Sequence, residues 1–297
     1  MQSFLFNVLK GFLYLWALLP MRILYFLSDM LYILVYYIVG YRKKVVRQNI
    51  SRSFPAKNVE ERRRIEKNFY RHFCDYFVET VKLMHISDEE MLKRMRFTNA
   101  EQMNAILQDG KDVFLMLGHY GNWEWVPSIT RWLKGDILFA QIYRPLSNKA
   151  ADRFFLKLRS RFGSVGIPKN ETLRDIIRYR REGKQMMTGF IADQTPSKNN
   201  LHYWTQFLNQ DTPCLTGAEK IARKIDANVI YLDVRLVKRG YYEASFVPIS
   251  LDSAHAPENE ITECYMRMME KTIERAPQYW LWSHKRWKHQ HLKNAVA

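Results

Sequence analysis

Two strongly apolar segments at the N-terminus set the start of the chain apart from the rest. Residues 4–20 contain a single charged residue, Lys10, and residues 23–40 contain only Asp29. Each segment is short for a bilayer crossing, which takes about 20 apolar residues. A cleaved signal peptide fits poorly, because no basic region precedes the first segment and no small-residue cleavage site follows it. One segment can span a membrane while the other lies in the interface, or the two can form a shallow hairpin.

A cluster of basic residues follows the second apolar segment directly. Its members are Arg42, Lys43, Lys44, Arg47 and Arg52. Basic residues beside a membrane segment favour the cytoplasmic side and attract anionic lipid headgroups. We therefore predict that residues 1–40 form a membrane anchor and that residues 41–297 form one cytoplasmic domain. The alternative is that the two apolar segments are buried helices of that domain.

Beyond the anchor, the spacing of apolar residues predicts a long helix over residues 59–86. Apolar side chains recur every fourth position along one face of this helix. They are Ile65, Phe69, Phe73, Phe77 and Val81.

Short apolar runs then alternate with helical patterns through most of the remaining chain. The runs that predict strands are 113–117, 137–142, 185–192 and 228–236, with a hairpin turn at 238–240 leading into 241–249. The patterns that predict helices are 148–162, 171–182, 215–226 and 259–275. Alternation of this kind indicates an α/β fold with a mostly parallel, mixed central sheet flanked by helices.

Composition narrows the choice of partners. The 46 basic and 30 acidic residues give a net charge of +16, which favours an anionic partner such as nucleic acid, a phosphorylated substrate, an acidic carrier protein or anionic lipid. We expect no nucleic acid, because the chain has no helix-turn-helix, RRM or zinc-finger signature. The three cysteines are far apart, so neither a disulfide framework nor a zinc knuckle is expected.

The stretch "GHYGNWEW", residues 118–125, follows the first predicted strand. In an open α/β sheet, ligands bind at the carboxyl ends of the strands, where this stretch lies. Gly118 and Gly121 allow a sharp turn and close approach to a ligand. Asn122 is placed to cap a helix that begins near residue 123. His119 and Glu124 therefore stand at the predicted site.

An imidazole is a suitable general base near neutral pH, and a carboxylate that binds its other ring nitrogen fixes the tautomer. If Glu124 lies in the first turn of the predicted helix, it can serve His119 in this way. No serine or cysteine adjoins the pair, so we expect direct activation of a substrate hydroxyl without a covalent intermediate. Two alternatives stay open: a structural core histidine, and a metal pair, for which the third ligand that catalytic zinc needs is not apparent.

Several blocks, in order along the chain, resemble one known family. "GHYGNWEW" resembles the His-x4-acid motif of the glycerolipid acyltransferase superfamily, and its His-x4-Glu form is similar to that of the late lipid A acyltransferases. "YRPLSNKAADR" at 143–153, "GFIADQTP" at 189–196 and "APQYWLWSHKRWK" at 276–288 resemble that family's other blocks. The chain departs from the family after the third block, where Phe207 and Leu208 are not followed by glycine until Gly217.

The resemblance implies transfer of an acyl chain from acyl carrier protein to a hydroxyl on a lipid A precursor, without a cofactor or a metal. His119 would then be the base and Glu124 its orienting carboxylate. Arg144 would stabilise the oxyanion, helped by backbone N–H groups near Gly118 and Gly121. The remaining residues implied to bind substrate are Asn122, Asp152, Asp193, Gln194 and Arg286.

Some of these assignments compete with structural readings. Asp193 and Gln194 follow a predicted strand and either position substrate or belong to a buried network. Arg286 either contacts lipid phosphates at the membrane surface or lies in a C-terminal block whose tryptophans, Trp280 and Trp282, are core anchors. Three functional alternatives also remain: another lipid acceptor such as a phosphatidylinositol mannoside, glycerol phosphate or aminolipid; a membrane-anchored nucleic-acid-binding protein; and a non-catalytic scaffold.

Overall fold

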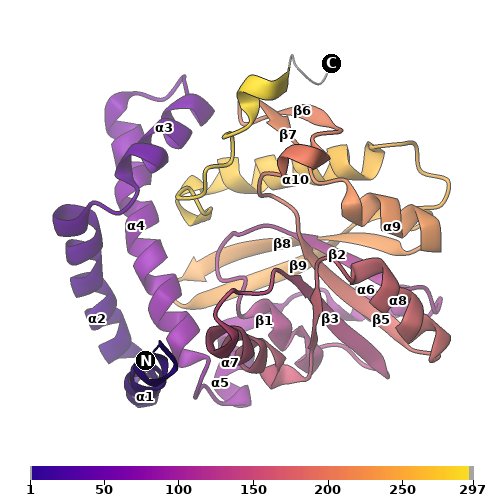
Figure 1. The fold of residues 1–297 in the computed structure, drawn as a ribbon, viewed down its shortest axis with the longest axis horizontal. Helices are drawn as coiled ribbons and strands as arrows, with labels where there is room; N and C mark the ends of the chain where they lie inside the picture. Colours follow the sequence, from indigo (N-terminus) through magenta and orange to yellow (C-terminus); the bar gives the residue numbers. More distant parts are fainter. Residues whose placement is uncertain (1, 294–297) are drawn as a thin grey trace.

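The computed structural model describes residues 2–293, and its centre is a seven-stranded sheet of order β1-β9-β8-β2-β5-β3-β4 (Figure 1). Neighbouring strands are parallel except for the β8–β9 hairpin. A separate two-stranded antiparallel sheet is formed by β6 and β7. The strands are β1 (Met95–Phe97), β2 (Val113–Leu117), β3 (Ile137–Tyr143), β4 (Val165–Pro168), β5 (Gln185–Ile191), β6 (Trp204–Phe207), β7 (Gln210–Pro213), β8 (Asn228–Lys238) and β9 (Tyr241–Ser250).

Helices cover the sheet, with α9 and α10 above it and α5 and α7 below it in Figure 1. The helices are α1 (Gln2–Leu18), α2 (Met21–Tyr32), α3 (Lys43–Ser53), α4 (Val59–Lys82), α5 (Asp88–Arg94), α6 (Ala100–Leu107), α7 (Lys149–Arg159), α8 (Thr172–Arg181), α9 (Gly217–Ile225) and α10 (Glu260–Arg275). A π-helix, η1 (Ile33–Val39), continues α2. The predicted fold class, an α/β sandwich with a mostly parallel mixed sheet, is confirmed.

All five side chains of β2 are buried, as expected for a central strand covered on both faces. Its neighbours β5 and β8 run parallel to it. The arrow of β8 in Figure 1 points toward α4, so the carboxyl ends of β2 and β5 face the same side. This edge of the sheet, closed by α4 and α2, is where the loops after β2 and β5 meet.

The predicted helix at 59–86 is α4, which is 24 residues long and begins with a capping box between Asn58 and Glu61. The predicted apolar stripe is only partly correct. Phe69 is buried, but Phe77 is 44% exposed, whereas Tyr70 and Val78 are buried. A strict four-residue spacing drifts around a helix of 3.6 residues per turn, so Phe77 faces away from the core, whereas Ile65 and Val81 at the two ends of the stripe are buried.

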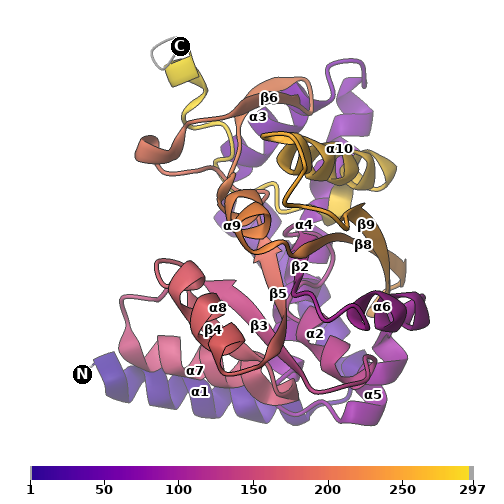
Figure 2. The same ribbon diagram turned by 90° about the vertical axis from the view of Figure 1, so that its right-hand side faces the viewer.

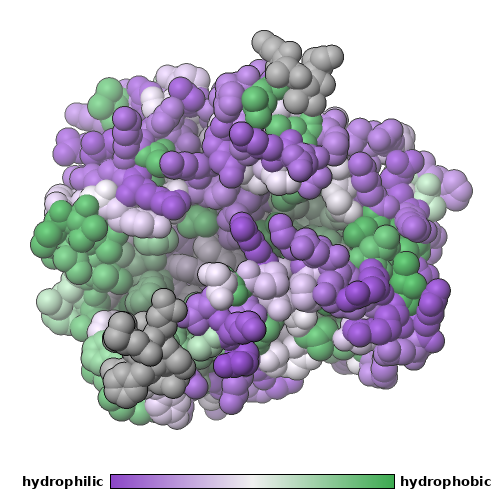
Figure 3. All heavy atoms as spheres, in the orientation of Figure 1, coloured by the Kyte–Doolittle hydropathy of each residue, from purple (hydrophilic) through white to green (hydrophobic). Residues whose placement is uncertain are grey.

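The N-terminal segments are helical, and Met21–Val39 is the one helix within residues 2–293 that is long and apolar enough to cross a membrane. One face of this helix packs on α4 and is buried, including Leu24 and Tyr36. The other face carries an apolar surface, which forms the green area at the left of Figure 3. The N-terminal segment is thus both a part of the core and a candidate anchor.

A buried carboxylate, Glu79 of α4, connects the N-terminal helices to the sheet. Its oxygens accept hydrogen bonds from Tyr25 of α2 (2.8 Å), Tyr242 of β9 (2.8 Å) and Asn122 in the loop after β2 (2.7 Å). Burial and the nearby charge of Asp75 raise the pKa of Glu79 to about 7, despite these three hydrogen bonds.

We predict that Glu79→Gln changes how stability depends on pH. A carboxyl group whose pKa is about 7 when folded, against an ordinary value of 4.5, stabilises the fold below pH 4.5, and this contribution is lost as the pH rises through 7. The difference corresponds to on the order of 3 kcal/mol. The variant should therefore gain apparent melting temperature relative to the parent between pH 5 and pH 8.

The melting temperatures of parent and variant must be compared at each pH, because other buried groups change the stability with pH in the opposite direction. Burial lowers the pKa of His72 and of His284, so their contributions increase as the pH rises. They cancel in the difference between parent and variant. Parallel melting profiles for the two proteins would contradict the assignment of this titration to Glu79.

Candidate active site

The loop that carries His119 leaves β2 with two glycines that the packing requires. A Cβ on Gly118 would collide with the sulfur of Met269 in α10 and crowd the Asp193 carboxylate. Gly121 has φ +61, a left-handed conformation that favours glycine. The predicted sharp turn is therefore present, and the close packing at Gly118 brings His119 against the loop after β5.

The C-terminal block forms a short antiparallel bridge with this loop. Tyr120 pairs with Trp280, and the N–H of Leu281 donates to the carbonyl of His119 (3.1 Å). The N–H of Gly121 donates to the carbonyl of Tyr279 (3.0 Å). Of the backbone N–H groups near Gly118 and Gly121 that are predicted to help stabilise an oxyanion, the Gly121 N–H is already bonded to the C-terminal block in this structure.

Asp193, the second residue after β5, binds the His119 ring. Its Oδ1 lies 2.7 Å from His119 Nδ1, and its Oδ2 accepts hydrogen bonds from the His119 backbone N–H (2.9 Å) and from Trp280 Nε1 (2.7 Å). Burial alone would raise the pKa of Asp193, but His119 and the donated hydrogen bonds outweigh it and lower the pKa to about 2. Asp193 is therefore ionised at neutral pH.

The ionised carboxylate fixes the tautomer of His119. Because Asp193 can only accept, Nδ1 must carry the proton, and Nε2 of the neutral ring then holds a lone pair. That nitrogen lies 3.1 Å from Gln194 Nε2, so the Gln194 amide donates to it. The arrangement presents a basic nitrogen at the strand ends, with a neighbouring amide in the place that a substrate donor would take.

The prediction that Glu124 binds His119 is wrong in this structure. Both carboxylate oxygens of Glu124 bind Arg159 of α7, at 2.8 and 2.6 Å, and Tyr76 of α4 donates to one of them at 3.5 Å. The predicted helix near residue 123 does not form either. Residues 123–125 are a turn that leads into a 3₁₀ helix, η2 (Val126–Arg131), so Glu124 is not aimed back at the ring.

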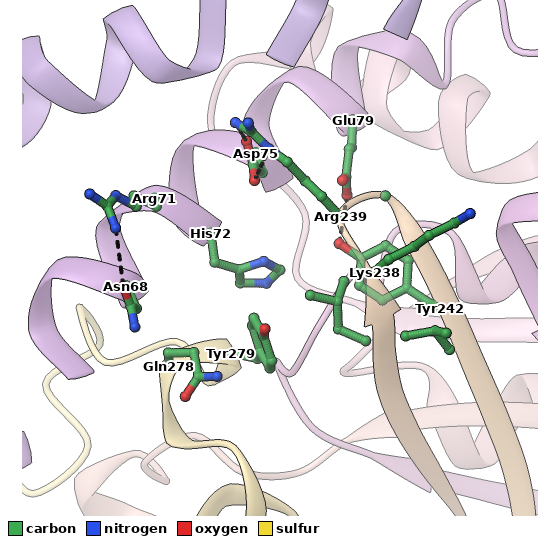
Figure 4. Close-up of a pocket in the computed structure, with 13 residues that line it drawn as sticks. Asn68, Arg71, His72, Asp75, Glu79, Lys238, Arg239, Tyr242, Gln278 and Tyr279 are labelled. Atoms are coloured by element: carbon green, nitrogen blue, oxygen red, sulfur yellow. Dashed lines mark hydrogen bonds and ion pairs between the residues drawn. The ribbon is translucent and has the colours of Figure 1, made fainter. Parts of the chain in front are cut away.

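Asn122 does not cap a helix, contrary to prediction. Its side-chain amide donates to Glu79, and Trp125 Nε1 donates to the Glu79 carbonyl (3.2 Å). The segment therefore follows the surface of α4. From the same helix, His72 bonds to the carbonyl of Gly121 (3.1 Å) and lines a cavity of about 310 Å³ behind the loop (Figure 4). The loop after β2 is thus held by α4 through His72 and Glu79.

Arg144 directly follows β3, the next strand in the sheet after β5, and Asp152 lies in α7. Arg144 is exposed, and Asp152 accepts a hydrogen bond from the N–H of Leu146 (2.7 Å), which holds the loop that carries Arg144. Within residues 2–293, neither side chain has a hydrogen bond to His119 or Asp193. Since β3 is the neighbour of β5, Arg144 lies at the same edge of the sheet as His119.

Arg286 does not reach the surface, so its predicted contact with the membrane is wrong. It is fully buried and donates to the carbonyl of Pro213 (2.8 Å), while burial lowers its pKa. Trp280 and Trp282 are buried as well, which confirms their reading as core anchors. The C-terminal block therefore acts from inside the fold.

Three contacts near the site were not predicted from sequence. Trp280 binds Asp193, Arg159 binds Glu124, and His284 Nε2 accepts a hydrogen bond from the N–H of Thr195 (3.4 Å). Burial lowers the pKa of His284 to about 4, so this second histidine is neutral and its lone pair is occupied. The Trp280 contact could have been sought, because its block was singled out; nothing in the pattern around Arg159 distinguishes it from other arginines.

Neither a metal centre nor a thiol nucleophile is apparent in the part of the chain that the structure describes. No group of three His, Cys, Asp or Glu side chains between residues 2 and 293 could hold a metal ion. Burial raises the pKa of Cys74 to about 12 and that of Cys214 to about 11, so both remain protonated thiols at neutral pH. A histidine base that acts directly on a substrate fits this environment.

The family model for bacterial lipid A biosynthesis acyltransferases matches residues 1–289. The chain belongs to this family. It is 23% identical over 285 residues to the lipid A biosynthesis palmitoleoyltransferase of Escherichia coli (strain K12), an alignment that covers 94% of this chain and 89% of that protein. The same identity and coverage relate it to the lipid A biosynthesis acyltransferase of Shigella flexneri.

Membership makes the chain an acyltransferase and implies an acyl donor and a lipid A precursor as acceptor. The family is also consistent with a bacterial membrane enzyme, for which the apolar helix at Met21–Val39 is a candidate anchor. In this acyltransferase, the histidine of the His-x4-Glu motif binds an aspartate from the third sequence block instead of the motif's own glutamate.

For this lipid A acyltransferase, Asp193→Asn and Glu124→Gln should affect the pH–rate profile differently. Loss of the Asp193 charge frees the ring to take the wrong tautomer, which should lower kcat by roughly 10³–10⁴-fold and move the acid limb of the profile to lower pH. Glu124→Gln should leave the position of that limb unchanged, because Arg159 already neutralises Glu124. An acid limb that moves only in Glu124→Gln would contradict the assignment of Asp193.

Trp280→Phe tests the contribution of the C-terminal block. The variant keeps an aromatic ring in the core but removes the donor to Asp193 Oδ2. A hydrogen bond to a charged group contributes about 1.5–3 kcal/mol, so kcat should fall by about tenfold or more. Trp282→Phe is the matched control, since Trp282 Nε1 donates to the Pro277 carbonyl and not to the site. Equal losses of activity in the two variants would indicate a general packing effect.

Proposed function

We propose that this enzyme transfers a fatty acyl chain from acyl carrier protein to a hydroxyl on a lipid A precursor, at the cytoplasmic face of the inner membrane. The observation that carries the proposal is the pairing of His119 Nδ1 with Asp193, which leaves Nε2 as a base. Family membership supports the acceptor class. The net charge of +16 suits an acidic carrier protein, a phosphorylated acceptor and anionic lipid.

The reaction begins when the acceptor hydroxyl replaces the Gln194 amide next to His119 Nε2. His119 takes the hydroxyl proton while the oxygen attacks the thioester carbonyl carbon. The resulting tetrahedral oxyanion collapses, the new ester C–O bond remains, and the C–S bond breaks. The carrier thiolate leaves and takes the proton from the His119 imidazolium, so the base is regenerated.

The other site residues hold these groups in place. Asp193 orients the His119 ring and stabilises the imidazolium. Arg144, on the exposed loop at the end of β3, is the candidate for the oxyanion, because a guanidinium offers a fixed fork of donors. Glu124 acts through Arg159, which it holds at the end of α7. We assign Glu124 a positioning role on this basis.

His119→Ala should abolish acyl transfer, with the folded state intact. The assay uses purified full-length protein, acyl carrier proteins loaded with chains of several lengths and a lipid A precursor, and mass spectrometry reads the product. Circular dichroism and melting temperature check folding. Turnover that is retained in the variant would remove His119 as the base.

The acceptor requires a separate experiment. A deletion strain should lack an acyl chain on its lipid A, and the parent gene should restore it while His119→Ala should not. If lipid A is unchanged and another membrane lipid loses an acyl chain, the acceptor assignment is wrong although the chemistry stands.

A further inference from the structure

We propose that the helix at Met21–Val39 lies in the plane of the membrane interface, against an anionic lipid leaflet, and does not cross the bilayer. The proposal rests on the proposed function, since it specifies how that membrane enzyme meets its membrane. Length and composition alone permit a crossing, because the helix has 19 residues of sufficient hydropathy. The contacts of the helix decide otherwise.

The helix has two different faces. The face toward α4 is buried and carries Met21, Leu24, Ser28, Tyr32 and Tyr36. The opposite face is exposed and apolar, with Phe26 64%, Met30 55% and Ile38 73% exposed. A helix that crosses a bilayer alone meets lipid all round, whereas this helix offers lipid a single stripe.

Three charged groups, one buried and two partly exposed, lie beside the middle of the helix. Ser28 donates to Asp75 of α4 (2.6 Å), and Arg239 at the tip of the β8–β9 hairpin binds both Asp75 (2.6 Å) and Asp29 (2.7 Å). Figure 4 shows the contact between Arg239 and Asp75. If residues 21–39 crossed the bilayer, Asp29 would lie near its centre and would bring Arg239 and Asp75 with it.

Packing along α4 makes such a placement more costly still. Besides Asp75 and Glu79 on its inner face, α4 has exposed basic residues, among them Arg63, Arg64 and Arg71. Charged side chains in hydrocarbon are strongly disfavoured unless they face a protein interior or water. Since α2 and α4 pack side by side, the bilayer cannot surround one helix without the other.

The preceding helix is fastened to the domain in the same way. The ammonium of Lys82 donates to the carbonyls of Ala17 and Leu19, both at 2.9 Å, at the break between α1 and α2. Near the start of α1, the Phe6 ring packs edge-on against the Phe154 ring of α7, with 5.9 Å between the ring centroids. Figure 1 shows α1 nearly end-on and α2 lengthwise, so the two helices lie at a large angle to each other. The two helices each lie along the domain and do not form a hairpin.

Basic residues at the margin of the apolar face indicate an anionic leaflet. Four exposed basic residues are close to this face, either in the sequence or through a contact: Arg22, Arg42, Lys44 and Arg71. The guanidinium of Arg71 lies over the Tyr32 ring at 5.2 Å, next to η1. Apolar side chains beside exposed cations are typical of interfacial helices that bind anionic lipids. The carboxyl ends of β2 and β5 point toward the side of the molecule where α4 and α2 lie (Figure 1).

Depth measurements by spin labelling test the placement directly. Single cysteines replace Ile23, Phe26, Met30 and Ile38 in full-length protein whose partly exposed Cys264 has been changed to serine. The protein is reconstituted in vesicles that contain phosphatidylethanolamine and phosphatidylglycerol. A crossing helix would spread these positions over about 20 Å of depth, at 1.5 Å per residue. Docking in the plane predicts similar depths within roughly 10 Å of the headgroup boundary.

A label at Val59, which is 73% exposed at the start of α4, serves as the aqueous control. A depth profile that reaches the bilayer centre near Met30 would overturn the proposal.

In vesicles without phosphatidylglycerol, flotation should recover several-fold less protein; equal recovery would overturn the assignment of an anionic leaflet. Acyl transfer by the same labelled proteins is measured separately. An inactive protein with a flat profile counts against the proposed function, and an active one with a deep profile counts against this placement.

Discussion

The buried carboxylate of Asp193 is the point on which the active site depends. It binds the ring and the backbone of His119 and the indole of Trp280, so three segments far apart in sequence meet at one group. A buried anion is tolerated only when donors surround it, and these donors are also what place the base. The parallel pairing of β2 with β5 makes the meeting possible, because it sets the ends of both strands at one edge of the sheet.

The sequence predicts most of the strands and helices, because apolar runs and helical spacing are clear in this chain. It also places His119 and Asp193 at strand ends. It does not reveal that β2 and β5 are neighbours, since strand order depends on packing that no local pattern records. The partner assigned to His119 was wrong for a related reason: Glu124 is close in sequence, but its contact required a helical turn that Asn122 and Trp125 prevent by binding Glu79.

Hydropathy alone also left the N-terminal segment ambiguous. The few polar residues in its apolar run give the decisive information, because Tyr25, Ser28 and Asp29 each bind a specific group of the domain. Glu79 extends this connection from α2 to the loop of the site. The N-terminal helix and the loop that carries His119 are therefore parts of one packed structure, and both bind the same buried carboxylate.

The position of Trp280 near the end of the 297-residue chain has a consequence for biosynthesis. The N-terminal helices leave the ribosome first, while the bridge between Tyr120 and Trp280 cannot form until the chain has been made as far as Trp280. At a translation rate of about 5–20 residues per second, many seconds separate the two events. A nascent chain therefore displays its apolar N-terminal helix well before Trp280 can bind Asp193, so the two ends of this structure are assembled at different times.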